Sequence, residues 1–84
     1  MAVKYEINMF ETDPNDASKT FVTLVVTTET GKSLAISKSV TTGSNTDAQI
    51  VKAAQTAAQS EIDTWVSQVT NIGKVWNPDT EKIE

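Results

Sequence analysis

The apolar residues of this 84-residue chain change their spacing once, near residue 46, and that change limits the folds open to it. Before this point apolar and polar residues alternate, which is typical of β-strands with one buried face. After it apolar residues recur every three or four positions, which is typical of an amphipathic helix. A run of strands followed by one long helix predicts a single α+β domain over residues 1–84.

Three strands of an antiparallel meander are predicted, over residues 3–10, 19–28 and 33–41. The connection between the first two strands is expected to be a loop over residues 11–18, which are rich in Asp and Asn and contain a proline. The connection between the second and third strands is expected to be a tight turn around Gly31, because glycine tolerates a positive φ.

The two faces of the predicted sheet differ in character. Alternate residues of the first strand are expected to face the core: Val3, Tyr5, Ile7 and Met9. Phe10 then falls on the outer face, near the loop. The second strand is apolar on both faces and is therefore expected at the centre of the sheet. The exposed outer face of the sheet would then carry Phe21, Val25 and Ala35.

One long C-terminal helix is predicted over residues 47–72, packed on the sheet. Thr46 and Gln49 match a capping box at its start, and Gly73 is expected to take a left-handed C-terminal cap. The apolar stripe of this helix consists of Val51, Ala54, Ala58, Ile62, Trp65, Val69 and Ile72.

Residues 74–84 form a tail for which the sequence leaves alternatives open. The segment around Trp76 is expected either to return as a short fourth strand or to lie across the edge of the sheet. Trp76 either plugs the open end of the core or contacts a partner, since tryptophan is strongly enriched at interface hot spots. Residues 81–84 are expected to fray.

Histidine, cysteine and arginine are absent from the sequence, and this absence bears on function more than any motif. The chain therefore lacks a proton shuttle for neutral pH, a thiolate nucleophile, a soft metal ligand and a bidentate phosphate clamp. The acidic residues Glu11, Asp13 and Asp16 depart from the calcium-binding EF-hand pattern, in which a glutamate would replace Leu24. We expect no catalytic residue, no cofactor and no metal.

The charge and hydropathy of the chain bear on its partners. A net charge of −4 and scattered lysines argue against binding to nucleic acid, which needs clustered cations. Without cysteine there is no disulfide framework, and no apolar stretch is long enough for a membrane span or a signal peptide. The expected location is the cytoplasm of a host cell or a virion.

The chain resembles small open reading frames of tailed bacteriophages. The similarity lies in the Thr/Ser-rich strands, in the helix start Thr46-Asp47-Ala48-Gln49-Ile50 and in the tail from Gly73 to Pro78. It covers most of the chain but includes no diagnostic motif, so it transfers no functional residue. The resemblance implies a virion accessory or assembly protein. The alternative is an acidic inhibitor of a host defence or nucleic-acid-binding protein, which would mimic DNA phosphates.

The expected function is non-enzymatic protein binding or assembly, with another protein or a second copy as the partner. A domain this small has a marginal core, and an interface would add to its stability. The interface candidates are Trp76, Phe10, Phe21, Val25 and Ala35.

Overall fold

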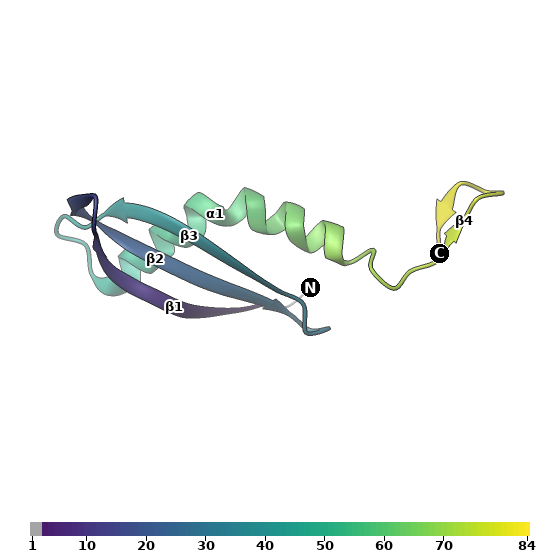
Figure 1. The fold of residues 1–84 in the computed structure, drawn as a ribbon, viewed down its shortest axis with the longest axis horizontal. Helices are drawn as coiled ribbons and strands as arrows, with labels where there is room; N and C mark the ends of the chain where they lie inside the picture. The colour runs from purple at the N-terminus through teal and green to yellow at the C-terminus, as the bar shows by residue number, and fades with distance from the viewer. Residues whose placement is uncertain (1–2) are drawn as a thin grey trace.

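The computed structural model describes residues 3–84 and confirms the α+β fold. Three antiparallel strands form a sheet in the order β1-β2-β3, and one helix, α1, packs on one face of it (Figure 1). The chain ends in a separate two-stranded hairpin. The elements are β1 (Val3–Asp13), β2 (Asp16–Thr28), β3 (Ser33–Thr41), α1 (Asp47–Val69), β4 (Trp76–Asn77) and β5 (Lys82–Ile83).

The first hairpin of the sheet is longer than predicted, because residues 11–18 are mostly strand rather than loop. Asp13 pairs with Asp16, so that the chain reverses over Pro14 and Asn15. The Asp13 carboxylate accepts a hydrogen bond of 2.8 Å from the backbone N–H of Asn15. Such a local bond from an Asp side chain favours a tight turn. The Asp and Asn residues here mark a short reversal within the sheet.

A β-bulge at Asn8 interrupts the alternation of β1. Ile7 pairs with Leu24, and the next pair along the strand is Met9 with Thr23, which leaves Asn8 as an extra residue. One extra residue exchanges the two faces of a strand beyond the bulge. The faces of β1 after Asn8 are therefore the reverse of those that strict alternation predicts.

Two predicted placements on β1 are wrong for this reason. Met9 pairs with Thr23 on the outer face of the sheet, although the alternation placed it toward the core. Phe10 pairs with Val22, whose side chain is fully buried beneath α1, so Phe10 lies on the helix-facing side. No feature of the sequence around Asn8 predicts the bulge.

The helix begins as predicted and ends earlier. The Thr46 N–H donates to the Gln49 side chain at 2.8 Å, and the Gln49 N–H donates to the Thr46 hydroxyl at 3.2 Å, which confirms the capping box. At the other end the Thr70 hydroxyl donates to the carbonyl of Val66 at 2.7 Å. The helix ends at Val69 rather than at residue 72. Gly73 has the predicted left-handed conformation, with a φ of 93°, but it lies in the tail, because the C-cap residue of the helix is Thr70.

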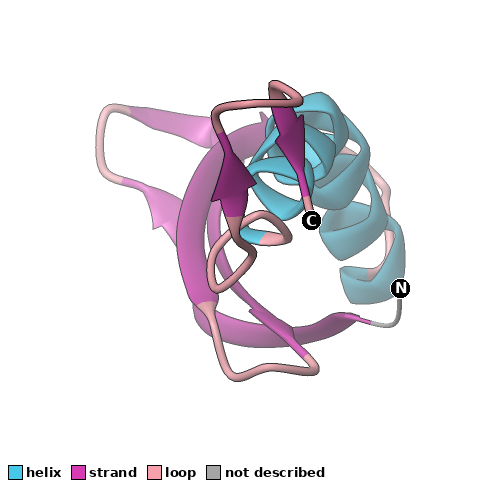
Figure 2. Cartoon of the chain, turned by 90° about the vertical axis from the view of Figure 1, so that its right-hand side faces the viewer, coloured by secondary structure: helices cyan, strands magenta, loops and turns pink. Residues whose placement is uncertain are grey.

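The core lies between α1 and the inner face of the sheet. Small side chains allow the helix backbone to approach β2 closely, because Ala54 and Ala58 are almost fully buried in the middle of the contact. The helix packs along β3 and β2, and the twisted sheet curves around it (Figure 2). The buried apolar side chains are Val22, Leu24 and Val26 of β2 with Ile50, Ala54, Ala58 and Ile62 of α1.

The tail does not add a fourth strand to the sheet. β4 and β5 pair with each other, with Trp76 opposite Ile83, and the hairpin extends past the end of α1 (Figure 1). Trp76 is 57% exposed, so it does not plug the core. Residues 81–84 do not fray: the backbones of Val75 and Glu84 exchange hydrogen bonds of 2.9 and 2.7 Å.

Candidate functional site

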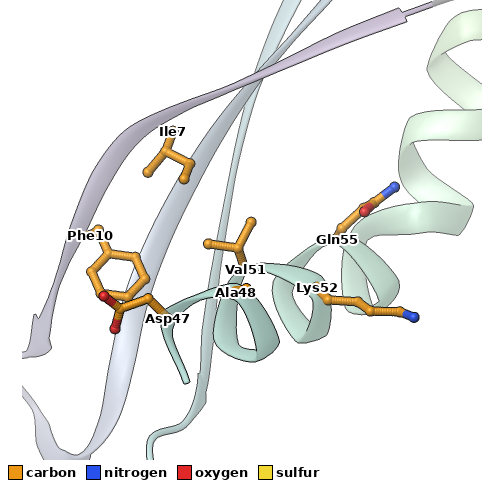
Figure 3. Close-up of a pocket in the computed structure, with 7 residues that line it drawn as sticks. All are labelled: Ile7, Phe10, Asp47, Ala48, Val51, Lys52 and Gln55. Carbon is orange, nitrogen blue, oxygen red and sulfur yellow. The ribbon is translucent and has the colours of Figure 1, made fainter. Parts of the chain in front are cut away.

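An open apolar groove runs between β1 and α1 on the helix-facing side of the sheet. We call it the β1–α1 groove. Its wide part has a volume of about 630 Å³. Ile7 and Phe10 point from β1 toward Ala48 and Val51 of α1 (Figure 3). Polar side chains of the helix complete the lining: Asp47, Lys52 and Gln55.

The groove exists because α1 is displaced toward β3. Ile7 pairs with Leu24, and Phe10 pairs with Val22. The two β2 partners are buried under the helix, whereas Ile7 is 52% exposed and Phe10 is 39% exposed. Residues on one face of one sheet thus differ in burial only because the helix covers β2 and not β1. The groove is an uncovered flank of the core.

A second, smaller stretch of the groove lies further along the same two elements, between the start of β1 and the second half of α1. Its volume is about 360 Å³. The residues that line this stretch are Val3, Tyr5, Gln59, Ile62, Asp63, Val66 and Ser67. The two stretches together follow β1 and form a long, shallow site. Such a site is suited to a segment of protein chain, which binds through side chains spaced along its length.

A row of polar side chains follows the groove along α1. The Gln55 amide donates to the Gln59 carbonyl oxygen at 3.4 Å, and the Gln59 amide donates to the Asp63 carboxylate at 2.8 Å. These residues are four positions apart, so they lie above one another on the helix. The groove therefore has an apolar wall on β1 and a wall with hydrogen-bonding groups on α1. This composition supports binding of an apolar segment with polar flanks and offers no acid–base pair.

The acidic residues at the tip of the β1–β2 hairpin lie outside the groove. The Ser39 hydroxyl and the Asn15 N–H donate to the Asp13 carboxylate and hold its pKa below the ordinary value. The Ser18 hydroxyl and N–H lower the pKa of Asp16 in the same way. Among residues 3–84 no group of three acidic, His or Cys side chains is placed to hold a metal ion. These carboxylates stabilise a turn.

The outer face of the sheet is a second candidate surface. Val25 of β2 pairs with Ala35 of β3, and Phe21 lies further along β2 on the same face. The Thr23 and Ser37 hydroxyls form a hydrogen bond of 2.8 Å between them. The face mixes hydroxyl groups with apolar side chains, and Ala35 at its edge also lines a hollow of about 400 Å³ between β3 and α1, smaller than the wide part of the groove beside β1. It is a weaker candidate.

The structure distributes the predicted interface residues over three places. Phe10 lines the groove, and Trp76 lies on the C-terminal hairpin. The other three share the outer face: Phe21, Val25 and Ala35. The sequence pattern assigned Ile7 and Val51 to the core and gave Ala48 no role, whereas all three line the wide part of the groove. A signal for Val51 existed, because Ile50 and Val51 are both apolar and so widen the apolar side of the helix.

No helix within residues 3–84 is both long and apolar enough to cross a membrane. Comparisons of the chain with protein-family models, with curated proteins and with solved structures find no match.

Proposed function

We propose that this chain is a non-enzymatic module for protein binding or assembly, and that it receives a segment of its partner in the β1–α1 groove. One observation carries the proposal. Ile7 and Phe10 are exposed although they lie directly opposite buried core residues of β2. The inner face of the sheet is thus only partly covered by the chain's own helix.

The energetics of a small core support the same proposal. Each Å² of apolar surface removed from water contributes about 25 cal/mol, and a core of this size is marginal on its own. A partner segment laid against Ile7 and Phe10 would extend the core by a third row of side chains, beside those of β2 and α1. Binding and stability would then increase together.

The resemblance to small phage proteins fits a role of this kind. A virion accessory or assembly protein works through surfaces, and the groove supplies one. The alternative role, acidic inhibition of a host protein, would instead use carboxylates as the contact surface. The chain has an excess of acidic residues, but those of the β1–β2 hairpin tip are engaged in turn hydrogen bonds. We therefore favour binding in the groove over acidic inhibition.

Site-specific photo-crosslinking tests the proposed function. A photoreactive residue, Phe10→p-benzoylphenylalanine, is introduced and irradiated in the cells or particles in which the protein is made. We expect a covalent protein adduct, either with another protein or with a second copy. The matched control carries the same residue in place of Ala35, which is exposed on the outer face.

The two positions give distinct outcomes. An adduct formed at position 10 and absent at position 35 supports the groove. An adduct formed only at position 35 would show that the partner binds the outer face of the sheet, and it would contradict the proposed binding in the groove. If neither position gives a protein adduct, the proposed function is wrong.

A further inference from the structure

The C-terminal hairpin (residues 74–84) forms a two-stranded sheet of its own, separate from the three-stranded sheet. It extends past the end of α1 along the long axis of the molecule, which measures 56 Å (Figure 1). Three of its large apolar side chains are more than half exposed: Val75, Trp76 and Ile83. A two-stranded hairpin alone is marginally stable in water. A partner surface that covers these exposed apolar groups would therefore stabilise the hairpin.

The hairpin has one apolar face and a well-formed turn. Trp76 and Ile83 lie directly opposite each other, so their side chains share a face. The side chain of Asn77 accepts a hydrogen bond of 2.9 Å from the N–H of Asp79, which orders the turn. A binding element that is already ordered loses less conformational entropy when it docks.

The hairpin cannot place Trp76 in the part of its own groove where Ile7 and Phe10 face Ala48 and Val51. The segment from Val69 to Trp76 spans at most about 25 Å when fully extended. Val51, on the groove wall, lies about 27 Å from Val69 along the helix axis. Three backbone hydrogen bonds within residues 68–74 shorten the segment further. The hairpin and the wide part of the groove of one chain therefore lie at opposite ends of α1.

We propose that the C-terminal hairpin of one copy docks in the β1–α1 groove of a second copy, with Trp76 and Ile83 against Ile7 and Phe10. This inference rests on the proposed function and names a second copy of the chain as the partner. Two copies side by side in opposite directions bring each hairpin to the groove of the other and form a closed pair. Copies that follow one another in the same direction form an open chain instead.

The exposed apolar area bears on how strongly two copies would associate. An aromatic side chain buries about 150–250 Å² when it is fully enclosed. In a closed pair each copy contributes the exposed parts of Trp76 and Ile83 from the hairpin and of Ile7 and Phe10 from the groove. Several hundred Å² per copy result, which is less than the ~800 Å² per partner of a standard interface, so we expect an association that depends on concentration.

Pairing through the free edge of β1 is less favoured than docking on its inner face. The bulge at Asn8 breaks the regular row of backbone groups along β1. The strand also carries charged side chains at Lys4, Glu6 and Glu11. Bulges and charges are the features by which edge strands avoid adding a further strand. The partner is therefore expected to contact side chains rather than to extend the sheet.

Two complementary variants test the inference on the purified full chain. Ile7→Glu places a charge in the groove and leaves the hairpin intact, whereas Trp76→Ser removes the hairpin contact and leaves the groove intact. Association is measured by sedimentation velocity over a concentration series. We expect the wild type to associate and each variant alone to associate about tenfold more weakly or less, as for a hot-spot residue. A mixture of the two variants regains association, because it contains one intact hairpin and one intact groove.

The control variant is Ala35→Glu, on the exposed outer face. It should associate like the wild type. Loss of association in this variant but not in Trp76→Ser assigns the contact to the outer face and overturns the inference. A wild type that stays monomeric at every concentration, or a mixture that does not regain association, overturns it as well. Circular dichroism of each variant checks that the fold is retained.

Crosslinking then distinguishes this inference from the proposed function on which it rests. Chain with the photoreactive residue at position 10 is mixed with ¹⁵N-labelled chain, and the adduct is mapped by mass spectrometry. We expect the adduct to join position 10 to residues 74–84 of the other isotopic copy. An adduct within one copy overturns the inference. A monomeric chain that forms an adduct only with a different protein in its native source overturns it too, while the proposed function stands.

Discussion

Lys38 of β3 and Glu61 of α1 form an ion pair, with 2.5 Å between Nζ and Oε1. Lys38 lies on the helix-facing side of the sheet, between Ile36 and Val40. A lysine at that position reaches water only at the edge of the sheet, and Glu61 meets it there. The pair ties the helix to β3, the edge strand opposite β1.

The Lys38–Glu61 pair should contribute little to overall stability. Both side chains are partly exposed, so the attraction between them is screened by water. We expect a coupling free energy of about 0.2–1 kcal/mol, as for other surface pairs. A double-mutant cycle of Lys38→Met and Glu61→Gln, followed by urea denaturation, measures it. A coupling well above this range would mean that the pair is shielded from solvent.

Ala58 should tolerate no larger side chain. It is fully buried where the helix approaches β2, and it packs with Val26 and Ile62. Ala58→Leu should lower the free energy of unfolding by about 1–3 kcal/mol, since overpacking strains a core. Ala57→Leu is the matched control, because Ala57 is exposed on the same helix. Equal effects of the two substitutions would contradict the helix orientation described here.

The two tryptophans should differ sharply in their effect on stability. Trp65 is half-buried against the cluster of Val26, Ala58 and Ile62, so Trp65→Ala should lower the free energy of unfolding by about 2–3 kcal/mol. Trp76→Ala should change it by less than about 0.5 kcal/mol in dilute solution, because exposed positions contribute little. Urea denaturation followed by circular dichroism compares them. A large loss in Trp76→Ala under dilute conditions would show that the hairpin packs on its own domain.

The Asp13 carboxyl should titrate below its ordinary pKa of 3.8, because the Ser39 hydroxyl and the Asn15 N–H donate to the ionised form. A lowered folded-state pKa means that this contribution to stability is present above the unfolded-state value. It is lost as the pH falls through the folded-state value, below 3.8. NMR titration of the Asp13 side chain measures the midpoint.

A serine substitution provides the comparison for that titration. Ser39→Ala should raise the pKa of Asp13 toward its ordinary value, since it removes the principal donor. Ser37→Ala should leave the pKa of Asp13 unchanged, because the Ser37 hydroxyl bonds to Thr23 instead. The same midpoint in both variants would contradict the assigned hydrogen bond.

Deletion of Asn8 should be tolerated by the fold. Asn8 is the extra residue of the bulge, so its removal gives a regular strand in which Ile7 and Met9 keep their present faces. Deletion of Thr23 from the central strand is the control, since it would exchange the faces of half of β2 and should unfold the chain. Thermal denaturation of both variants checks this expectation. Unfolding caused by the Asn8 deletion would mean that the bulge itself is required.

Local patterns in the sequence determined the α+β fold. The alternation in the strands and the capping box at Thr46 are local features, because each depends on residues within a few positions of one another. They therefore predict the strands, the start of the helix and most of the face that it buries. The predicted stripe omitted Ile50, which is buried, and included Ile72, which lies beyond the helix and is exposed. They do not predict how far the strands extend, because the pairing of Asp13 with Asp16 depends on two strands meeting.

The tertiary structure alone decided where the candidate site lies. The bulge at Asn8 moved Phe10 to the inner face, and the displacement of α1 toward β3 left it uncovered beside Val51. Both are consequences of how twisted strands and a helix fit together over long distances in the sequence. The sequence did not predict the exposure of Trp76 either, because it left open whether the segment around Trp76 joins the three-stranded sheet. In the structure this segment pairs with β5 instead. Periodicity tells which side of an element is apolar, but only packing decides which part of that side is covered.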